Sequence, residues 1–250
     1  MKCLFFIFFA LCWSSQSMPA ASQIDAAEII QLIDAGKPIE FENITIRGQL
    51  DFTAVKDITE EESNSDQATY HCHIRTPITF IRCKFQGDII AYVSHRTPNE
   101  LYTPIFHEPV RFEDCQINGE FRFKYVRFIK GSDFPNTHFK DEINFKYTLF
   151  SKQADFSHVA FEDEVTFKYT RFPEYVDFTN AFFKKDACFK YTKFPEGVSF
   201  KNAVFDDDAD FKYAQMEGPV NFAGVGFSGD ANFKYTKVNG KSFTLHPHEK

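Results

Sequence analysis

The tripeptide Phe-Lys-Tyr recurs on a strict count, beginning every 22 residues at Phe123, Phe145, Phe167, Phe189, Phe211 and Phe233. Between 123 and 211, further Phe residues divide each interval into alternating steps of 5 and 6. A helix repeats its apolar residues every 3 or 4 positions and a half-buried strand every 2, so neither explains this spacing. The pattern predicts a coil with four short sides, each pointing one large residue inward.

The residue two before each of these Phe residues is usually small or β-branched, as in Ile143, Val165 and Ala187. Side chains two apart on an extended segment share a face, so this residue should point inward as well. Successive coils should then stack about 4.8 Å apart, as parallel strands do. Coils starting at Phe41, Phe80 and Phe112, and every 22 residues from there to Phe222, make about eight.

Short motifs in these coils resemble a known repeat. The triplets "ADF" (154–156 and 209–211), "VDF" (176–178) and "ANF" (231–233) are similar to the motif A-(D/N)-(L/F)-x-x of the pentapeptide-repeat family. The resemblance covers residues 38–245 and implies an all-β fold, a right-handed parallel quadrilateral β-helix. The chain departs from a strict period of five because alternate sides carry one extra residue, which implies wider corners.

The two ends differ from the coils. Residues 1–20 combine a positive start, an apolar run and small residues, which predicts a secretory signal peptide and a periplasmic or extracellular protein with no transmembrane segment in the mature chain. Residues 22–37 predict a helix that caps the first coil. Residues 246–250 are expected to be a tail. No cap is apparent at the C-terminal end, where gyrase-protecting family members dimerise, so the resemblance implies a homodimer through that end.

Composition narrows the partners and the chemistry. Phe accounts for 33 of 250 residues, and the formal charge is −7, which makes nucleic acid an improbable ligand. Cys83 and Cys115 occupy equivalent inward positions on neighbouring coils, within reach of a disulfide. A disulfide and two packed thiols both fit this placement.

Two insertions, near 53–76 and 92–109, interrupt the count after the same side of consecutive coils. They should therefore leave the rod side by side, as loops on a rigid scaffold where sites often lie. His71, Cys72 and His73 are weak candidates for a metal site, against the simpler reading that they pack over the coil. No nucleophile, base and orienting group can be assembled, so we expect no enzyme, no cofactor and no metal.

The period also stacks surface residues into columns, and this is where a binding site is predicted. A Lys column and a Tyr column run along one corner, at Lys124, Tyr125, Lys146, Tyr147, Lys168, Tyr169, Lys190, Tyr191, Lys212, Tyr213, Lys234 and Tyr235. Tyr offers stacking area and Lys offers charge, which suits an anionic polysaccharide. The simpler interpretation is that Tyr covers the corner while Lys keeps the rod soluble.

These observations favour an exported, non-catalytic scaffold that presents the two columns and the paired loops to a protein or an anionic glycan. The acidic sides leave open a gyrase-binding DNA mimic, a function that the family resemblance implies. A metal or ligand site on the paired loops is the third alternative.

Overall fold

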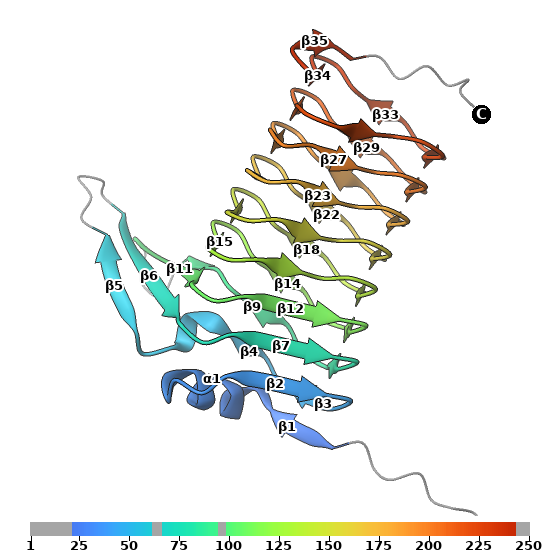
Figure 1. The fold of residues 1–250 in the computed structure, drawn as a ribbon. Coiled ribbons are helices and arrows are strands. Elements are labelled where there is room, and N and C mark those ends of the chain that lie inside the picture. Colours follow the sequence, from blue (N-terminus) through green and yellow to red (C-terminus); the bar gives the residue numbers. More distant parts are fainter. Residues whose placement is uncertain (1–21, 62–66, 95–98, 244–250) are drawn as a thin grey trace, which may run out of the picture.

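The computed structural model describes residues 22–61, 67–94 and 99–243, which form one rod of stacked coils (Figure 1). The predicted signal peptide at 1–20 and the tail at 246–250 lie outside these ranges. Within them no helix has the length and apolar character needed to cross a membrane. The strands belong to four faces, so the predicted four-sided parallel β-helix is confirmed.

Two faces hold eight strands each. The first, which we call the β2 face, contains β2 (Ile39–Glu42), β7 (Ile78–Ile81), β12 (Val110–Glu113), β16 (Ser132–Asp133), β20 (Ala154–Asp155), β23 (Val176–Asp177), β27 (Val198–Ser199) and β31 (Val220–Asn221). The β4 face contains β4 (Leu50–Asp51), β9 (Ile89–Ile90), β14 (Phe121–Arg122), β18 (Ile143–Asn144), β22 (Val165–Thr166), β25 (Ala187–Cys188), β29 (Ala209–Asp210) and β33 (Ala231–Asn232). Eight strands on the β2 face correspond to the eight predicted coils.

The β3 face lies between these two along the chain and contains β1 (Gln23–Asp25), β3 (Thr45–Arg47), β8 (Lys84–Phe85), β13 (Gln116–Ile117), β17 (His138–Phe139), β21 (Ala160–Phe161), β24 (Phe182–Phe183), β28 (Val204–Phe205) and β32 (Gly226–Phe227). The fourth, the β15 face, is split into two sheets. The coil strands on it are β15 (Arg127–Phe128), β19 (Leu149–Phe150), β26 (Lys193–Phe194), β30 (Gln215–Met216), β34 (Lys237–Val238) and β35 (Lys241–Ser242).

The register of the coils is the sequence period itself. Ile143 pairs with Val165, 22 residues on, and Val165 pairs with Ala187, all in parallel. Each coil thus supplies hydrogen-bond partners for the next: the amide of Phe145 donates to the carbonyl of Thr166 at 2.8 Å. Upstream, Phe41 pairs with Phe80 and Phe80 with Phe112, so the predicted alignment of the irregular first coils is confirmed.

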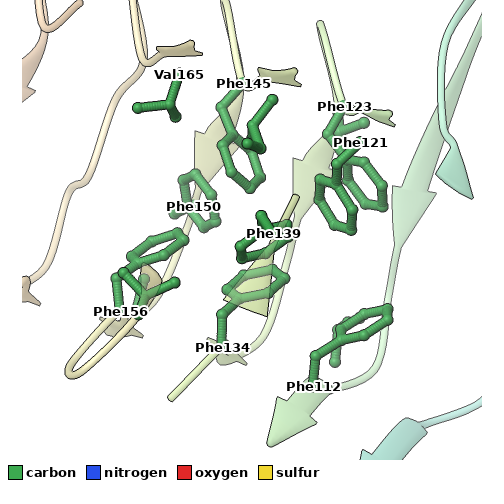
Figure 2. Packing of buried hydrophobic residues seen from close by; sticks show 14 of the residues in the cluster. Phe112, Phe121, Phe123, Phe134, Phe139, Phe145, Phe150, Phe156 and Val165 are labelled. Atoms are coloured by element: carbon green, nitrogen blue, oxygen red, sulfur yellow. The ribbon is translucent and has the colours of Figure 1, made fainter. Parts of the chain in front are cut away.

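The core is a set of Phe ladders. Phe145, Phe167 and Phe189 are fully buried, and their ring centroids lie 5.1 and 5.0 Å apart with nearly parallel planes. Rings from adjoining sides meet edge to face, as Phe167 and Phe178 do at 5.4 Å. Figure 2 shows this arrangement around Phe134 and Phe145. Both geometries are the favourable ones for aromatic pairs.

Buried threonines strengthen one corner. Thr148 and Thr170 are completely buried, and their hydroxyls donate to the carbonyls of Phe123 and Phe145 in the preceding coil, at 2.6 and 2.7 Å. Each bond adds a link between coils at a corner, where the strand ladder has ended. In the segment "NFKYTLF" the two Phe residues and Thr148 therefore face inward, as the period predicts, and Tyr147 faces outward.

The N-terminal cap is shorter than the predicted span of 22–37. Helix α1 covers Ala26–Asp34 and buries Ile29, Ile30 and Ile33 against the first coil. Residues 23–25 form β1 instead, paired in parallel with β3. The physical reason is that β3 would otherwise present unpaired backbone groups at the end of its sheet, which these residues satisfy.

The C-terminal end is partly covered. Phe243 lies over the last ladder, 5.5 Å from Phe222 and 5.1 Å from Phe233 between ring centroids. Phe222, Phe227 and Phe233 remain only partly buried. The predicted homodimer through this end stays a prediction.

The two insertions are not irregular loops, contrary to the expectation for 53–76 and 92–109. After the 3-10 turn η1 (Phe52–Ala54) they form a side sheet of β5 (Ile58–Glu61), β6 (Ala68–Ile74), β10 (Val93–Ser94) and β11 (Glu100–Phe106). β6 and β11 pair in parallel over seven residues, and only the last two positions of β11 pair with the coil strand β15. The rest of the side sheet projects from the rod (Figure 1). Long strands formed because each insertion offers the other a pairing edge.

The Phe ladders should dominate stability. Phe167→Ala is expected to lower the free energy of unfolding by about 3–5 kcal/mol, because it removes a fully buried ring and leaves a cavity. Val204→Ala, at a position 40% exposed, should change it by less than about 0.5 kcal/mol. Guanidinium chloride titration followed by circular dichroism measures both. Similar small losses in the two variants would contradict a core built on these ladders.

Candidate ligand-binding face

The FKY corner, where the β4 face turns into the β15 face, has an unusual backbone. Each Tyr of the Tyr column is left-handed, with φ between 58° and 64°. That conformation costs an L residue about 1–2 kcal/mol and favours Gly or Asn. Of the eight left-handed positions between the β2 and β3 faces, five follow this rule: four are Asn, as at Asn136, Asn180 and Asn202, and one is Gly224. The FKY corner therefore keeps Tyr for its side chain.

The six rings form a continuous stack. Consecutive ring centroids are 4.7–4.9 Å apart and the planes lie within 18° of parallel. Tyr92 continues the row toward the side sheet, but its ring is tilted by 43° to that of Tyr125, with the centroids 5.9 Å apart. Each inner ring is thus covered on both faces by its neighbours. The expectation that Tyr offers stacking area to a ligand is wrong for the inner rings, which leave only their edges and hydroxyls to solvent.

The Lys column lies along the same stack. The ammonium groups of five of its members lie 4.8–5.4 Å from the ring centroid of the following Tyr, within cation–π range. Lys190 differs, because its Nζ forms an ion pair with Asp210 at 2.5 Å. In the described ranges no other member of the Lys column has an ion pair within 4.0 Å. The corner therefore carries a row of largely uncompensated positive charge.

An acidic column precedes the Lys column by four residues, at Glu120, Glu142, Glu164, Asp186, Asp208 and Asp230. It does not neutralise the lysines. Burial raises the pKa of Glu142, and the negative charges of Glu120 and Glu164 raise it further. Opposite charges thus form separate columns, each repelling itself, which leaves the positive one available to an anion.

The side sheet separates the three residues of the weak metal candidate. Cys72 is fully buried, and its thiol lies 3.7 Å from the carbonyl of Thr53. His71 and His73 point to the opposite face, because successive side chains alternate along a strand. Nδ1 of His71 lies 3.2 Å from the hydroxyl of Thr103, and Nδ1 of His73 lies 2.8 Å from Nε2 of His107. These three side chains do not converge on one point, and no group of three or more ligands that could hold a metal is found in the described ranges.

The cysteine pair lies inside the rod. Cys83 and Cys115 are 1% and 2% exposed, and both are free thiols. A hydrogen bond from Cys115 lowers the pKa of the Cys83 thiol to about 7 and raises the pKa of the Cys115 thiol. Two packed thiols are the arrangement in this structure, and their oxidation to a disulfide stays a prediction.

Comparison with known proteins bears on the fold. The family model "Pentapeptide repeats (9 copies)" matches residues 104–149, 145–192 and 189–237. No curated protein matches the chain significantly. A solved structure of trypsin-treated QnrB1, described as a plasmid-mediated fluoroquinolone resistance protein, matches at 15% sequence identity and a TM-score of 0.21. That alignment covers 61% of this chain and 82% of the QnrB1 chain.

The histidine pair of the side sheet should titrate below the usual value of 6.5. Burial lowers the pKa of His107, and the charges of Arg75 and His73 lower it further. The neutral ring is favoured in the folded state, so its stabilisation is present above pH 6.5 and lost as the pH falls. His73→Gln should shift the pKa of His107 upward, measured by NMR titration of its ring proton. An unchanged value would contradict this coupling, and His138→Gln serves as the control because it pairs with Glu162 instead.

Proposed function

Because this chain belongs to the pentapeptide-repeat family, we propose that it is an exported, non-catalytic scaffold whose FKY corner binds a linear anionic polysaccharide. The observation that carries the proposal is the left-handed Tyr stack beside a Lys column with few ion pairs. A corner built only for geometry would use Asn or Gly, as most of the corners between the β2 and β3 faces do.

The corner offers two kinds of group to a polymer. The Tyr hydroxyls line the outer edge of the stack, where each can donate or accept a hydrogen bond. The ammonium groups supply positive charge beside them, repeated once per coil. An acidic polysaccharide matches this combination, because its hydroxyls can hydrogen-bond to the Tyr side chains and its carboxylate or sulfate groups can bind the ammonium groups.

The spacing favours a polysaccharide over other polyanions. One Tyr and one Lys recur every 4.7–4.9 Å along the stack. Alternate side chains of an extended acidic peptide are about 6.6 Å apart, so they would lose register within a few coils. Phosphates of one DNA strand follow at about 3.4 Å along the axis. A sugar ring is about as long as one coil is tall, which allows one unit per coil.

The gyrase-binding alternative is less well supported. A DNA mimic presents negative charge along its length, whereas the FKY corner presents a positive column over six coils. The acidic column around Glu142 is the feature that would serve such a mimic. A protein partner on the side sheet is compatible with the scaffold role and would use different residues.

Removing the Lys column should weaken polymer binding. Changing Lys146, Lys168, Lys212 and Lys234 to Ser should lower the affinity for polygalacturonate and reduce the dependence of binding on salt. The slope of log affinity against log salt should fall by about one for each lysine that contacts the polymer. Affinity measured by calorimetry at several salt concentrations provides both values.

A matched control separates this site from net charge. The same number of changes at Lys130, Lys152, Lys184 and Lys201 removes equal charge away from the corner. These changes should leave affinity nearly unaltered. An equal loss in both variants would mean that binding follows net charge and that the corner is not the site.

Export has its own test. Expressed with its own N-terminus in a Gram-negative host, the protein should appear in the periplasm or medium without its first 17 to 21 residues, since small residues there fit signal-peptide cleavage. Fractionation and intact mass spectrometry measure location and length. A full-length cytoplasmic product would overturn the exported part of the proposal.

A further inference from the structure

A cavity of about 200 Å³ opens on the β15 face, one step around the corner from the Tyr column. Its lining comes from three successive coils and includes Arg171, Pro173, Lys193, Pro195, Gln215 and Glu217. The fully buried Phe172 and Phe194 contribute to its floor. The volume lies below the roughly 300–1,000 Å³ of pockets for drug-sized ligands, so it suits one small unit.

The cavity coincides with a break in the backbone ladder. In the coils below, the amides of Ile129 and Ser151 donate to the carbonyls of Phe106 and Phe128, at 2.9 and 2.8 Å. The equivalent residues at the cavity are Pro173 and Pro195, which have no N–H to donate.

Two carbonyls therefore lose their ladder donors, those of Phe150 and Phe172. The break also explains why the β15 face divides into two sheets here, with Arg171 forming only isolated bridges to Leu149 and Lys193. Each carbonyl is a hydrogen-bond acceptor left for solvent or a ligand.

The cavity also carries cations without partners. Arg171 and Lys193 are exposed and lie on adjacent coils in parallel register. No ion pair is found for either within the described ranges, although Arg111 and Arg122 have them. A guanidinium presents a planar pair of donors that matches a carboxylate or sulfate.

We propose that this cavity is an anchoring subsite for one anionic sugar unit, through contacts with Arg171, Lys193 and the two freed carbonyls. The acidic group would lie between the two cations, and sugar hydroxyls would donate to the carbonyls of Phe150 and Phe172. The rings of Pro173 and Pro195 provide apolar surface for the sugar ring. Gln215 and Glu217 accept from further hydroxyls at the upper rim.

This inference rests on the proposed function and deepens it. The FKY corner supplies a repeated, weakly selective surface, whereas the cavity lies at the Pro173 and Pro195 break in the ladder and sets where the polymer begins to bind. A simple anion fits less well, because it cannot donate hydrogen bonds to the freed carbonyls or to Glu217. The combination of cations with acceptors is what selects a hydroxylated anion.

The test measures the binding of short oligosaccharides to the wild type and to variants that each change one element of the cavity. The probes are a galacturonate trisaccharide, a sulfated trisaccharide, neutral maltotriose and a short poly-glutamate, each titrated by calorimetry. Arg171→Gln removes the main anion contact, and Arg127→Gln is its control at the equivalent position two coils below. Pro195→Ala restores an amide opposite the carbonyl of Phe172, in the way that the amide of Ser151 meets the carbonyl of Phe128. This change occupies the acceptor and leaves the charge of the cavity unaltered.

Either acidic trisaccharide should bind the wild type, and the one that binds identifies the acidic group as carboxylate or sulfate. Arg171→Gln and Pro195→Ala should each weaken binding roughly tenfold or more, the ratio that corresponds to about 1.4 kcal/mol. The control variant Arg127→Gln should bind the acidic trisaccharide with unchanged affinity. Neutral maltotriose should not bind. Circular dichroism confirms that each variant keeps the fold.

Three results would overturn the subsite. Equal binding by the wild type, Arg171→Gln and Pro195→Ala would remove it while leaving polymer binding at the FKY corner intact. Tight binding of poly-glutamate through Arg171 would reassign the cavity to an acidic polypeptide. Binding of neither the trisaccharides nor polygalacturonate by the wild type would reject the proposed function and the subsite together.

Discussion

Parallel hydrogen bonding between coils is the constraint on which the whole molecule depends. From Val110 onward residue i pairs with residue i + 22 on every face, so each coil depends on its neighbours for its hydrogen bonds. The same register brings identical side chains into line, and the Phe ladders inside and the Tyr stack outside follow from it. It also explains why each end of the rod must be covered, since an end coil lacks one neighbour. Helix α1 and strand β1 cover the first coil, and Phe243 lies over the last ladder.

The corners of the coil differ in which residue occupies the left-handed position. Between the β2 and β3 faces, Asn or Gly takes the left-handed position in five of the eight coils, at little cost. At the FKY corner Tyr takes it, and stacking between neighbouring rings offsets the backbone strain by about 0.5–1.5 kcal/mol for each pair. Stacking thus offsets much of the strain at the corner, but it does not explain why five lysines without ion pairs among the described residues lie beside it. The combination is what distinguishes a surface suited to binding from a surface suited only to folding.

Much of the fold could be predicted from the sequence because the repeat is local and exact in its count. The coil starts, the inward Phe residues and the buried Thr148 all follow from spacing. The insertions could not be predicted in the same way, since the pairing of β6 with β11 joins segments 32 residues apart that have no repeat. The metal candidate at 71–73 failed because this segment is a strand, in which Cys72 points to the opposite face from His71 and His73. The hydrogen-bonded pair of His73 and His107 was missed because its two residues come from different insertions.

The sequence by itself determined the architecture, since a period of 22 with four large inward residues allows one closed coil and one register. It also placed Lys and Tyr on the same corner. The tertiary structure decided what that corner can do, because only stacking at 4.7–4.9 Å covers the Tyr faces and leaves their hydroxyls outward. It likewise decided that Pro173 and Pro195 open a cavity, since a missing amide matters only where a neighbouring coil brings a carbonyl to meet it.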